Sequence, residues 1–128
     1  MGTDLWYSND STDIRFATDI LKFRFLTNHA IKQGDFYSVD PSFFADTKAL
    51  KFNTDFCTDM YAAEAPDAIE PADSTAFSIF RYTENNTGAA IAYDDQYKIV
   101  VFGFPFETII DQNNRDSIMK ATLKFFEN

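Results

Sequence analysis

The clearest pattern of apolar and polar positions lies near the end of the chain. Residues 98–102 are an apolar run rich in β-branched side chains, which is typical of a strand covered on both faces. Pro105 has no backbone N–H, so strand pairing should stop there or lie at a sheet edge. Four apolar residues then recur on one face of a predicted helix over about 114–127: Ile118, Met119, Leu123 and Phe126. We therefore expect a buried strand followed by a helix that packs back onto the sheet, with Asn113 as its N-cap.

Two further strands are expected just before this one, over about 76–82 and 89–93, and the third strand extends over about 97–103. The segments between the strands are short and polar, so neighbouring strands should run antiparallel. The proline and acidic residues between 62 and 74 indicate an irregular connection instead.

The first half of the chain gives shorter signals. A helix is expected over about 12–21, with Ser11 as its N-cap. Residues 22–26 alternate in the manner of a half-buried strand, and residues 36–39 are a second short candidate. Asp40, which is followed by proline, predicts the N-cap of a brief helical turn.

Composition and charge narrow the class of protein. A length of 128 residues indicates a single domain, 1–128, and 45% apolar residues can form a sizeable, phenylalanine-rich core. The 20 acidic residues outnumber the 11 basic ones, and the formal charge is −9. Phosphate binding needs clustered Lys and Arg, so neither nucleic acid nor an anionic membrane is an expected partner. No apolar run is long enough to cross a membrane, and no signal peptide is expected in this chain.

The order of the last elements resembles a known family. Three strands, the sequence Gly-Phe-Pro-Phe-Glu at 103–107 and a helix ending in Lys-Phe-Phe are similar to the C-terminal half of class I glutamine amidotransferase-like domains. In the active enzymes of that family, the last strand leads into Phe-His-Pro-Glu, which supplies the catalytic His and Glu. Glu107 matches this Glu, but no histidine matches. The family's upstream strand and cysteine elbow are absent, and Cys57 lies in a different place.

A closer resemblance is to the amidotransferase-like region of large secreted bacterial proteins of the xanthan lyase-like or golvesin-like type. It rests on residues 2–5, residues 64–69, Arg81 with Tyr82, and residues 103–107. The resemblance implies an α/β fold in which this chain is the C-terminal half of a three-layer, flavodoxin-like domain. On its own, this half is expected to be an α+β piece with a mostly antiparallel sheet. The resemblance also implies an extracellular or periplasmic location and contacts with the rest of a parent chain. An exposed sheet edge on such a half-domain could pair with a second copy.

Two carboxylates are candidates for acid–base chemistry. Glu107 follows a predicted buried strand, at the kind of position where the ligands of open α/β sheets collect. Asp4 could complete a carboxylate pair suited to glycoside chemistry. We favour the structural alternative for both, in which Glu107 bonds the backbone or Arg115 and Asp4 closes a turn. A lone Glu without its histidine cannot orient a base.

Three further residues are candidates for binding a saccharide. Arg81 could clamp the carboxylate of an acidic sugar, Trp6 could stack on a sugar ring, and Asp67 could join a carboxylate cluster. The structural alternatives are an ion pair between Arg81 and one of the many acids, a core position for the aromatic residue, and a turn at Asp67. These alternatives are the ones we favour, although Trp6 is the best exception because it lies in a polar loop.

The sequence contains few residues suited to nucleophilic catalysis or to metal binding. His29 is the only histidine and Cys57 the only cysteine, so neither nucleophilic catalysis nor a zinc site is expected. Three oxygen ligands near the start of the chain lack the glycine and the distal glutamate of a calcium loop: Asn9, Asp10 and Asp13. We therefore expect no cofactor and no metal.

Together these observations favour a non-catalytic amidotransferase-like module of a larger secreted bacterial protein concerned with polysaccharide or the cell surface. Its role would be structural, interactive or ligand-binding, with a saccharide as the candidate ligand. The alternative is part of a hydrolase or polysaccharide lyase, in which Glu107 and Asp4 act as acid or base and Arg81 binds the sugar. The two interpretations differ in whether these three side chains converge on one pocket.

Overall fold

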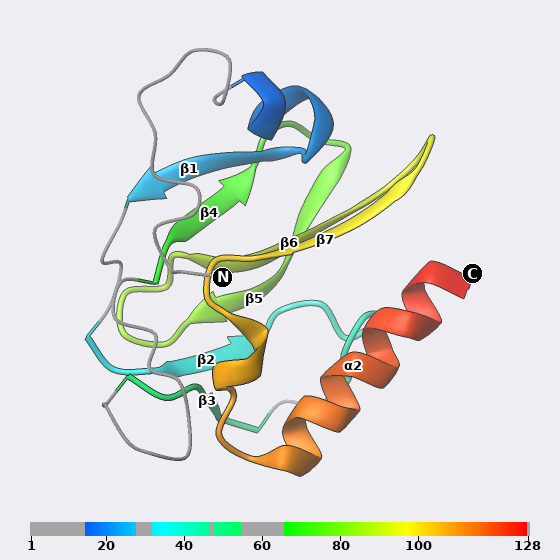
Figure 1. Cartoon of the computed structure of the whole chain (residues 1–128). Helices are drawn as coiled ribbons and strands as arrows, with labels where there is room; N and C mark the ends of the chain where they lie inside the picture. Colours follow the sequence, from blue (N-terminus) through cyan, green and yellow to red (C-terminus); the bar gives the residue numbers. More distant parts are fainter. Residues whose placement is uncertain (1–14, 28–31, 47, 55–65, 128) are drawn as a thin grey trace.

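The computed structural model of the protein describes residues 15–27, 32–46, 48–54 and 66–127 (Figure 1). Within these ranges the chain is a mixed α+β structure, as the sequence predicts, but it has one main helix where two helices were expected. The elements follow one another as η1 (Phe16–Ile20), β1 (Phe23–Thr27), β2 (Asp35–Ser38), β3 (Leu50–Lys51), β4 (Ala68–Pro71), β5 (Ala76–Tyr82), β6 (Gly88–Asp94), β7 (Lys98–Phe102), η2 (Phe106–Thr108) and α2 (Gln112–Glu127).

Five of the strands form a sheet in the order β3-β2-β5-β6-β7, and β1 pairs with β4 in a separate two-stranded sheet. All these pairings are antiparallel in the described ranges, which confirms the mostly antiparallel sheet. β5, β6 and β7 correspond to the three strands predicted at the end of the chain. Their short polar turns make them consecutive hairpins, and Ala92 lies opposite Val100 in the second.

The strand covered on both faces is β6, and the prediction that residues 98–102 are such a strand is wrong. Residues 88–93 of β6 are all buried, whereas only Val101 is buried in β7. β7 pairs with β6 alone among the described strands, so it is an edge of the sheet. β6 is rich in glycine and alanine, and these small side chains let a layer pack closely on each face.

The two faces of the five-stranded sheet carry different layers (Figure 1). On one face, α2 closes a core rich in phenylalanine. In this core the ring of Phe104 stacks on Phe52 at 4.3 Å and lies 4.9 Å from Phe36. On the other face, the β1–β4 pair and η1 cover a smaller core that includes Phe23 and Ile91. The order of layers places β6 at the centre of the molecule.

α2 differs from its prediction in its cap and in the face that it buries. Asp111 Oδ1 accepts the backbone N–H groups of Asn113 (2.8 Å) and Asn114 (3.3 Å), so the N-cap is Asp111 rather than Asn113. Of the four apolar residues expected to face the sheet, only Ile118 is buried, and α2 packs through it and Thr122. The other three are exposed: Met119 (40%), Leu123 (53%) and Phe126 (45%).

The connection expected to be irregular between 62 and 74 contains β4. Ala68 and Ile69 of this strand are fully buried, and Pro71 ends it opposite Phe23 of β1. A proline at the last position of a strand removes no hydrogen bond from the interior of the strand pair, so β4 can form in spite of Pro71. Just before β1, the described part of the helix expected over 12–21 is the short π-helix η1, none of whose residues is buried. Its expected cap, Ser11, lies outside the described residues.

Two glycines allow β4 to approach the sheet closely. A Cβ at Gly88 would overlap the carbonyl oxygen of Ile69, and a Cβ at Gly103 would overlap the carbonyl oxygen of Asp67. The backbone N–H of Asp67 donates to the carbonyl oxygen of Gly103 (2.7 Å), and the Tyr82 hydroxyl donates to the carbonyl oxygen of Asp67 (2.6 Å). These contacts join the start of β4 to the ends of β5 and β7.

Candidate functional site

A cavity of about 260 Å³ lies against the C-terminal half of α2. We call it the α2 cavity, and its lining comes from segments far apart in the sequence: Ser42, Phe43, Phe77, Asp94, Ala121, Lys124 and Phe125. Cavities that enclose drug-sized ligands measure about 300–1,000 Å³. The α2 cavity therefore suits a single ring more than an extended molecule.

Asp40 fixes the turn that brings Phe43 to the cavity. Its carboxylate accepts the backbone N–H of Ser42 (3.0 Å), and its carbonyl oxygen accepts the N–H groups of Phe43 (3.1 Å) and Phe44 (3.0 Å). The turn predicted after Asp40 is thus confirmed, with Asp40 as its cap. It connects β2 to the flank of α2.

Three phenylalanine rings form the apolar wall of the cavity. The ring centroid of Phe125 lies 5.6 Å from that of Phe43 and 6.4 Å from that of Phe77. Phe43 in turn lies edge-on to Phe80 at 6.3 Å, which connects the wall to the main core. Aromatic faces held by the core in this way can stack on a ring-shaped ligand.

Two charged side chains, those of Asp94 and Lys124, line the cavity beside this wall. Asp94 ends β6 with a side chain that is 47% exposed, and its Oδ1 lies 4.0 Å from the ammonium of Lys98. Lys124 is exposed on α2. A carboxylate only accepts hydrogen bonds and an ammonium only donates them, so the cavity offers both kinds of partner. The residues that line it include no histidine or cysteine, and the arrangement suits binding more than nucleophilic catalysis.

Glu107 lies on η2 and does not line the cavity. Its side chain is exposed, and no described residue forms a hydrogen bond or an ion pair with it. Arg115 donates to the carbonyl oxygens of Ile109 and Ile110 (3.2 Å to the latter). Among the described residues, Glu107 therefore forms neither of its predicted bonds, to the backbone or to Arg115. Among the described residues, Glu107 also has no base beside it.

Arg81 is held in an ion pair between two layers. Its Nη2 lies 3.2 Å from Glu70 Oε1, and its Nη1 donates to the carbonyl oxygen of Asn86 (2.8 Å). The other oxygen of the same carboxylate, Glu70 Oε2, accepts the backbone N–H of Gly88 (2.9 Å). The predicted pairing of Arg81 with an acid is confirmed, and its partner is on β4.

Asp67 is almost fully buried, with 1% of its surface exposed, just before β4. It lies beside the Tyr82 phenol, which is also buried. Burial, and secondly the charge of Asp67, raise the pKa of Tyr82 well above its usual value. Neither Asp67 nor Arg81 nor Glu107 lines the α2 cavity, so these three candidates do not converge there.

Tyr82→Phe should change how stability depends on pH in the alkaline range. The unfolded chain ionises this phenol near its ordinary pKa of about 10, whereas the folded chain keeps it protonated. Because the folded pKa is raised, the contribution of Tyr82 is complete below the unfolded pKa and is lost as pH rises, by about 1.4 kcal/mol per pH unit. Urea unfolding gives the free energy of unfolding of both chains at about pH 9 and about pH 11. Between these two pH values it should fall less for Tyr82→Phe than for the parent chain. An equal fall in the free energy of unfolding of the two chains would contradict the burial of the Tyr82 phenol.

Several sequence candidates lie outside the described residues: Asp4, Trp6, His29, Cys57, Asn9, Asp10 and Asp13. Conversely, sequence patterns missed the charged residues of the α2 cavity, Asp94 and Lys124. Each is an ordinary polar residue at the end of a strand or on a helix, and only the fold brings them together. The turn capped by Asp40 is the one predicted local structure that contains residues of the cavity, Ser42 and Phe43.

No family model matches the chain, and neither a curated protein nor a solved structure matches it. In the described ranges, no three side chains that could bind a metal gather at one place. None of the helices in these ranges has the length and apolar character needed to cross a membrane. The geometry of the α2 cavity is therefore the basis for a functional inference.

Proposed function

We propose that the chain is a non-catalytic, amidotransferase-like module of a larger secreted bacterial protein, and that it binds a saccharide in the α2 cavity. The observation that carries the binding part is the wall of three phenylalanine rings beside Asp94 and Lys124. A pyranose has an apolar C–H face and a rim of hydroxyl groups. The face can stack on the rings, and the hydroxyl groups can bond to the carboxylate and the ammonium.

A neutral sugar fits this site better than an acidic one. The chain has a formal charge of −9, which disfavours the approach of an acidic polymer. Arg81, the residue expected to clamp a sugar carboxylate, is engaged with Glu70 on another part of the sheet. The cavity also balances its one ammonium with one carboxylate. We therefore expect a neutral pyranose to be the preferred ring.

The amidotransferase-like part of the proposal is supported by residues 103–107 and by the succession of edge strand, proline and packing helix. In this proposal the chain is the C-terminal half of a three-layer domain, located outside the cytoplasm, and its antiparallel strands belong to that half. The enzymes of the family pair the corresponding glutamate with a histidine. Glu107 is exposed and has no base among its described neighbours, which favours a role without catalysis.

Calorimetric titration of the full chain tests the saccharide site. Methyl β-glucopyranoside serves as the neutral probe, and methyl β-glucuronopyranoside, a ring of the same size with a carboxylate, serves as the acidic one. We expect the neutral probe to bind more tightly and Lys124→Ala to weaken it about tenfold, because a hydrogen bond to a charged group contributes about 1.5–3 kcal/mol. Lys120→Ala is the matched control, since Lys120 is exposed on the same helix but does not line the cavity.

Two outcomes would contradict the proposal. The saccharide site is wrong if neither probe binds, or if Lys120→Ala weakens binding as much as Lys124→Ala does. The non-catalytic role is wrong if the chain turns over glutamine or a polysaccharide and Glu107→Gln abolishes that activity. The two parts therefore fail separately.

A further inference from the structure

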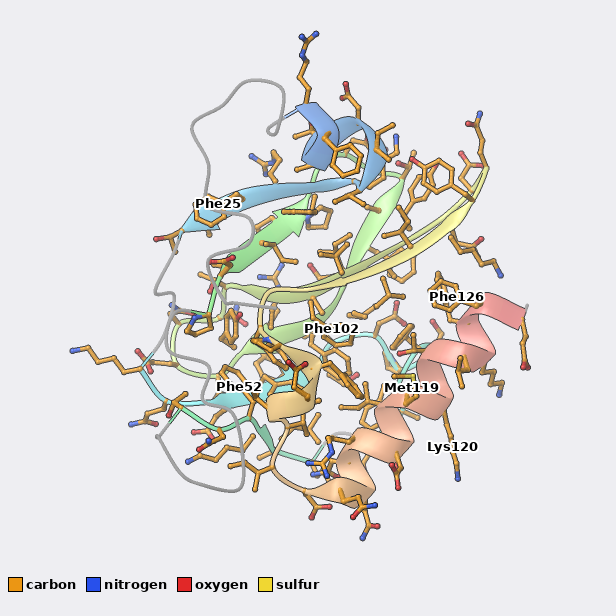
Figure 2. The ribbon with its side chains drawn as sticks, viewed as in Figure 1. Phe25, Phe52, Phe102, Met119, Lys120 and Phe126 are labelled. Atoms are coloured by element: carbon orange, nitrogen blue, oxygen red, sulfur yellow. The ribbon has the colours of Figure 1, made fainter. Side chains whose placement is uncertain are left out.

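α2 carries a second apolar stripe, away from the side that packs on the sheet. Met119, Leu123 and Phe126 are 40%, 53% and 45% exposed. Their spacing of four and three residues places them in one line along the helix. Figure 2 labels Met119 and Phe126 along α2 and shows Lys120 pointing away from the sheet. Aligned large apolar side chains on a surface commonly mark an interaction site.

Within the part of the chain that the structure describes, the edge strand β7 shows neither of two common protections of a sheet edge. Edge strands are commonly guarded by an outward lysine or by a proline within the strand. The only charged residue of β7, Lys98, is turned inward: its ammonium donates to the carbonyl oxygen of Phe125 (2.9 Å) and lies 5.3 Å from the Phe125 ring. Val100 and Phe102 remain partly exposed beside this edge. Among the described strands, only β6 pairs with β7.

The edge strand β7 reaches the C-terminal end of the helix that carries the stripe. Phe125 lines the cavity and contacts Phe43, so its flank faces the turn that follows β2. At 100° per residue, Met119 and Leu123 lie across the helix from Ala121, which also lines the cavity. β7 meets α2 at the C-terminal end of the helix, where Lys98 donates to the carbonyl oxygen of Phe125 (2.9 Å), the residue before Phe126 of the stripe.

We propose that a second copy of the chain docks on this surface through a two-fold axis. The axis pairs β7 with β7 of the other copy and lays the two α2 helices side by side. An antiparallel strand pair can be its own two-fold complement, so β7 needs no different sequence as a partner. An axis perpendicular to the sheet puts both helices on the same face, where their stripes meet.

Charge on this surface is compatible with a second copy. The whole chain has a formal charge of −9, but α2 carries only two acidic residues, Asp116 and Glu127, and β7 carries none. The basic residues of α2 number three: Arg115, Lys120 and Lys124. Two copies can therefore meet here without the repulsion that an acidic surface would impose. Antiparallel α2 helices also bring Lys120 of one copy toward Glu127 of the other.

This dimer goes beyond the proposed saccharide binding and does not depend on it. The α2 cavity lies on the opposite flank of the helix, next to the turn at Phe43, and stays open in the dimer. Loss of dimerisation and loss of sugar binding are therefore separate results.

Sedimentation velocity of the full chain, from micromolar to millimolar concentration, tests the dimer. We expect a monomer–dimer equilibrium, and Leu123→Asp should weaken it by about tenfold or more because a carboxylate loses its hydration in the interface. Leu26→Asp is the matched control: Leu26 is also 53% exposed but lies on β1, in the layer on the other side of the sheet. Circular dichroism should show that both variants keep the helix and sheet.

A charge exchange tests the antiparallel arrangement of the helices. Lys120→Glu should weaken the dimer, and adding Glu127→Lys in the same chain should restore it. A loss that the second substitution does not restore would overturn this arrangement. A chain that stays monomeric at every concentration, a dimer that Leu123→Asp leaves intact, or a dimer that Leu26→Asp breaks would overturn the proposal as a whole.

Discussion

Phe104→Ala should lower the free energy of unfolding by about 3–5 kcal/mol, as is usual when a buried aromatic ring is removed. Phe104 is 3% exposed and lies just after the edge strand β7. Its ring stacks on Phe52 at 4.3 Å with an interplanar angle of 8°, and lies 4.9 Å from Phe36 and 5.7 Å from Phe102. Alanine would leave a cavity where the exit of β7 packs against β2 and the residue after β3.

Phe126→Ala provides the matched comparison. The same side-chain atoms are removed, but Phe126 is 45% exposed, so the loss in the monomer should stay within about 0.5–1 kcal/mol. Urea unfolding at a concentration where the chain is monomeric gives both values. Similar losses for the two variants would contradict the placement of Phe104 in the core and of Phe126 on the surface.

Gly88→Ala should lower the free energy of unfolding by about 3 kcal/mol, although it adds only one methyl group. The new Cβ would overlap the carbonyl oxygen of Ile69 and lie 3.2 Å from Glu70 Cδ. Because the overlapping atom belongs to the backbone of β4, the whole strand must move away from β6. That movement also weakens the bond between the N–H of Gly88 and Glu70, whose carboxylate holds Arg81.

The control for this substitution is Thr83→Ala, which changes an exposed residue in the turn that follows β5. Its effect should stay within about 0.5 kcal/mol. Thermal unfolding followed by circular dichroism compares the two chains. If Gly88→Ala melts at the temperature of the parent chain, the close contact between β4 and β6 is not present.

The hairpins at the end of the chain could be predicted because their signals are local. Short polar turns separate three runs of strand-forming residues, and the structure contains β5, β6 and β7 in these places. The position of each strand within the sheet could not be predicted in the same way. Hydrophobicity marks residues 98–102, but the strand covered on both faces is β6, whose alanines give a weak signal and yet allow layers on both faces. Burial of β6 depends on β4 and α2, which lie far from it in sequence.

The orientation of α2 shows a similar limit. Its sequence has two apolar stripes at helical spacing, and periodicity alone does not reveal which of them faces the sheet. The buried side uses Ile118 with Thr122, whose hydroxyl donates to the carbonyl oxygen of Ile118 (2.8 Å) and is thereby satisfied. Because threonine is polar, its position in the core interrupts the apolar pattern by which the buried face of a helix is predicted. The stripe of Met119, Leu123 and Phe126 looks like the core face and is exposed instead.

The candidate site was predicted only in part. An ion pair between Arg81 and an acidic residue was predicted, because an acidic chain offers many partners. The partner itself was not predicted, since Glu70 lies in a strand that the sequence did not indicate. The cavity residues Phe43, Asp94 and Lys124 come from three separate segments with no shared motif. Their grouping follows from the order of strands in the sheet and from the path of α2 across it.

The proposed saccharide site is tested most directly by a nuclear magnetic resonance titration of the full, isotope-labelled chain with methyl β-glucopyranoside. We expect the amide signals of Phe43, Phe77, Asp94 and Lys124 to shift together with one saturation curve, while those of Glu107 and Arg81 stay in place. Shifts centred on Glu107 and Arg81, or no shifts at millimolar sugar, would contradict a binding site in the α2 cavity.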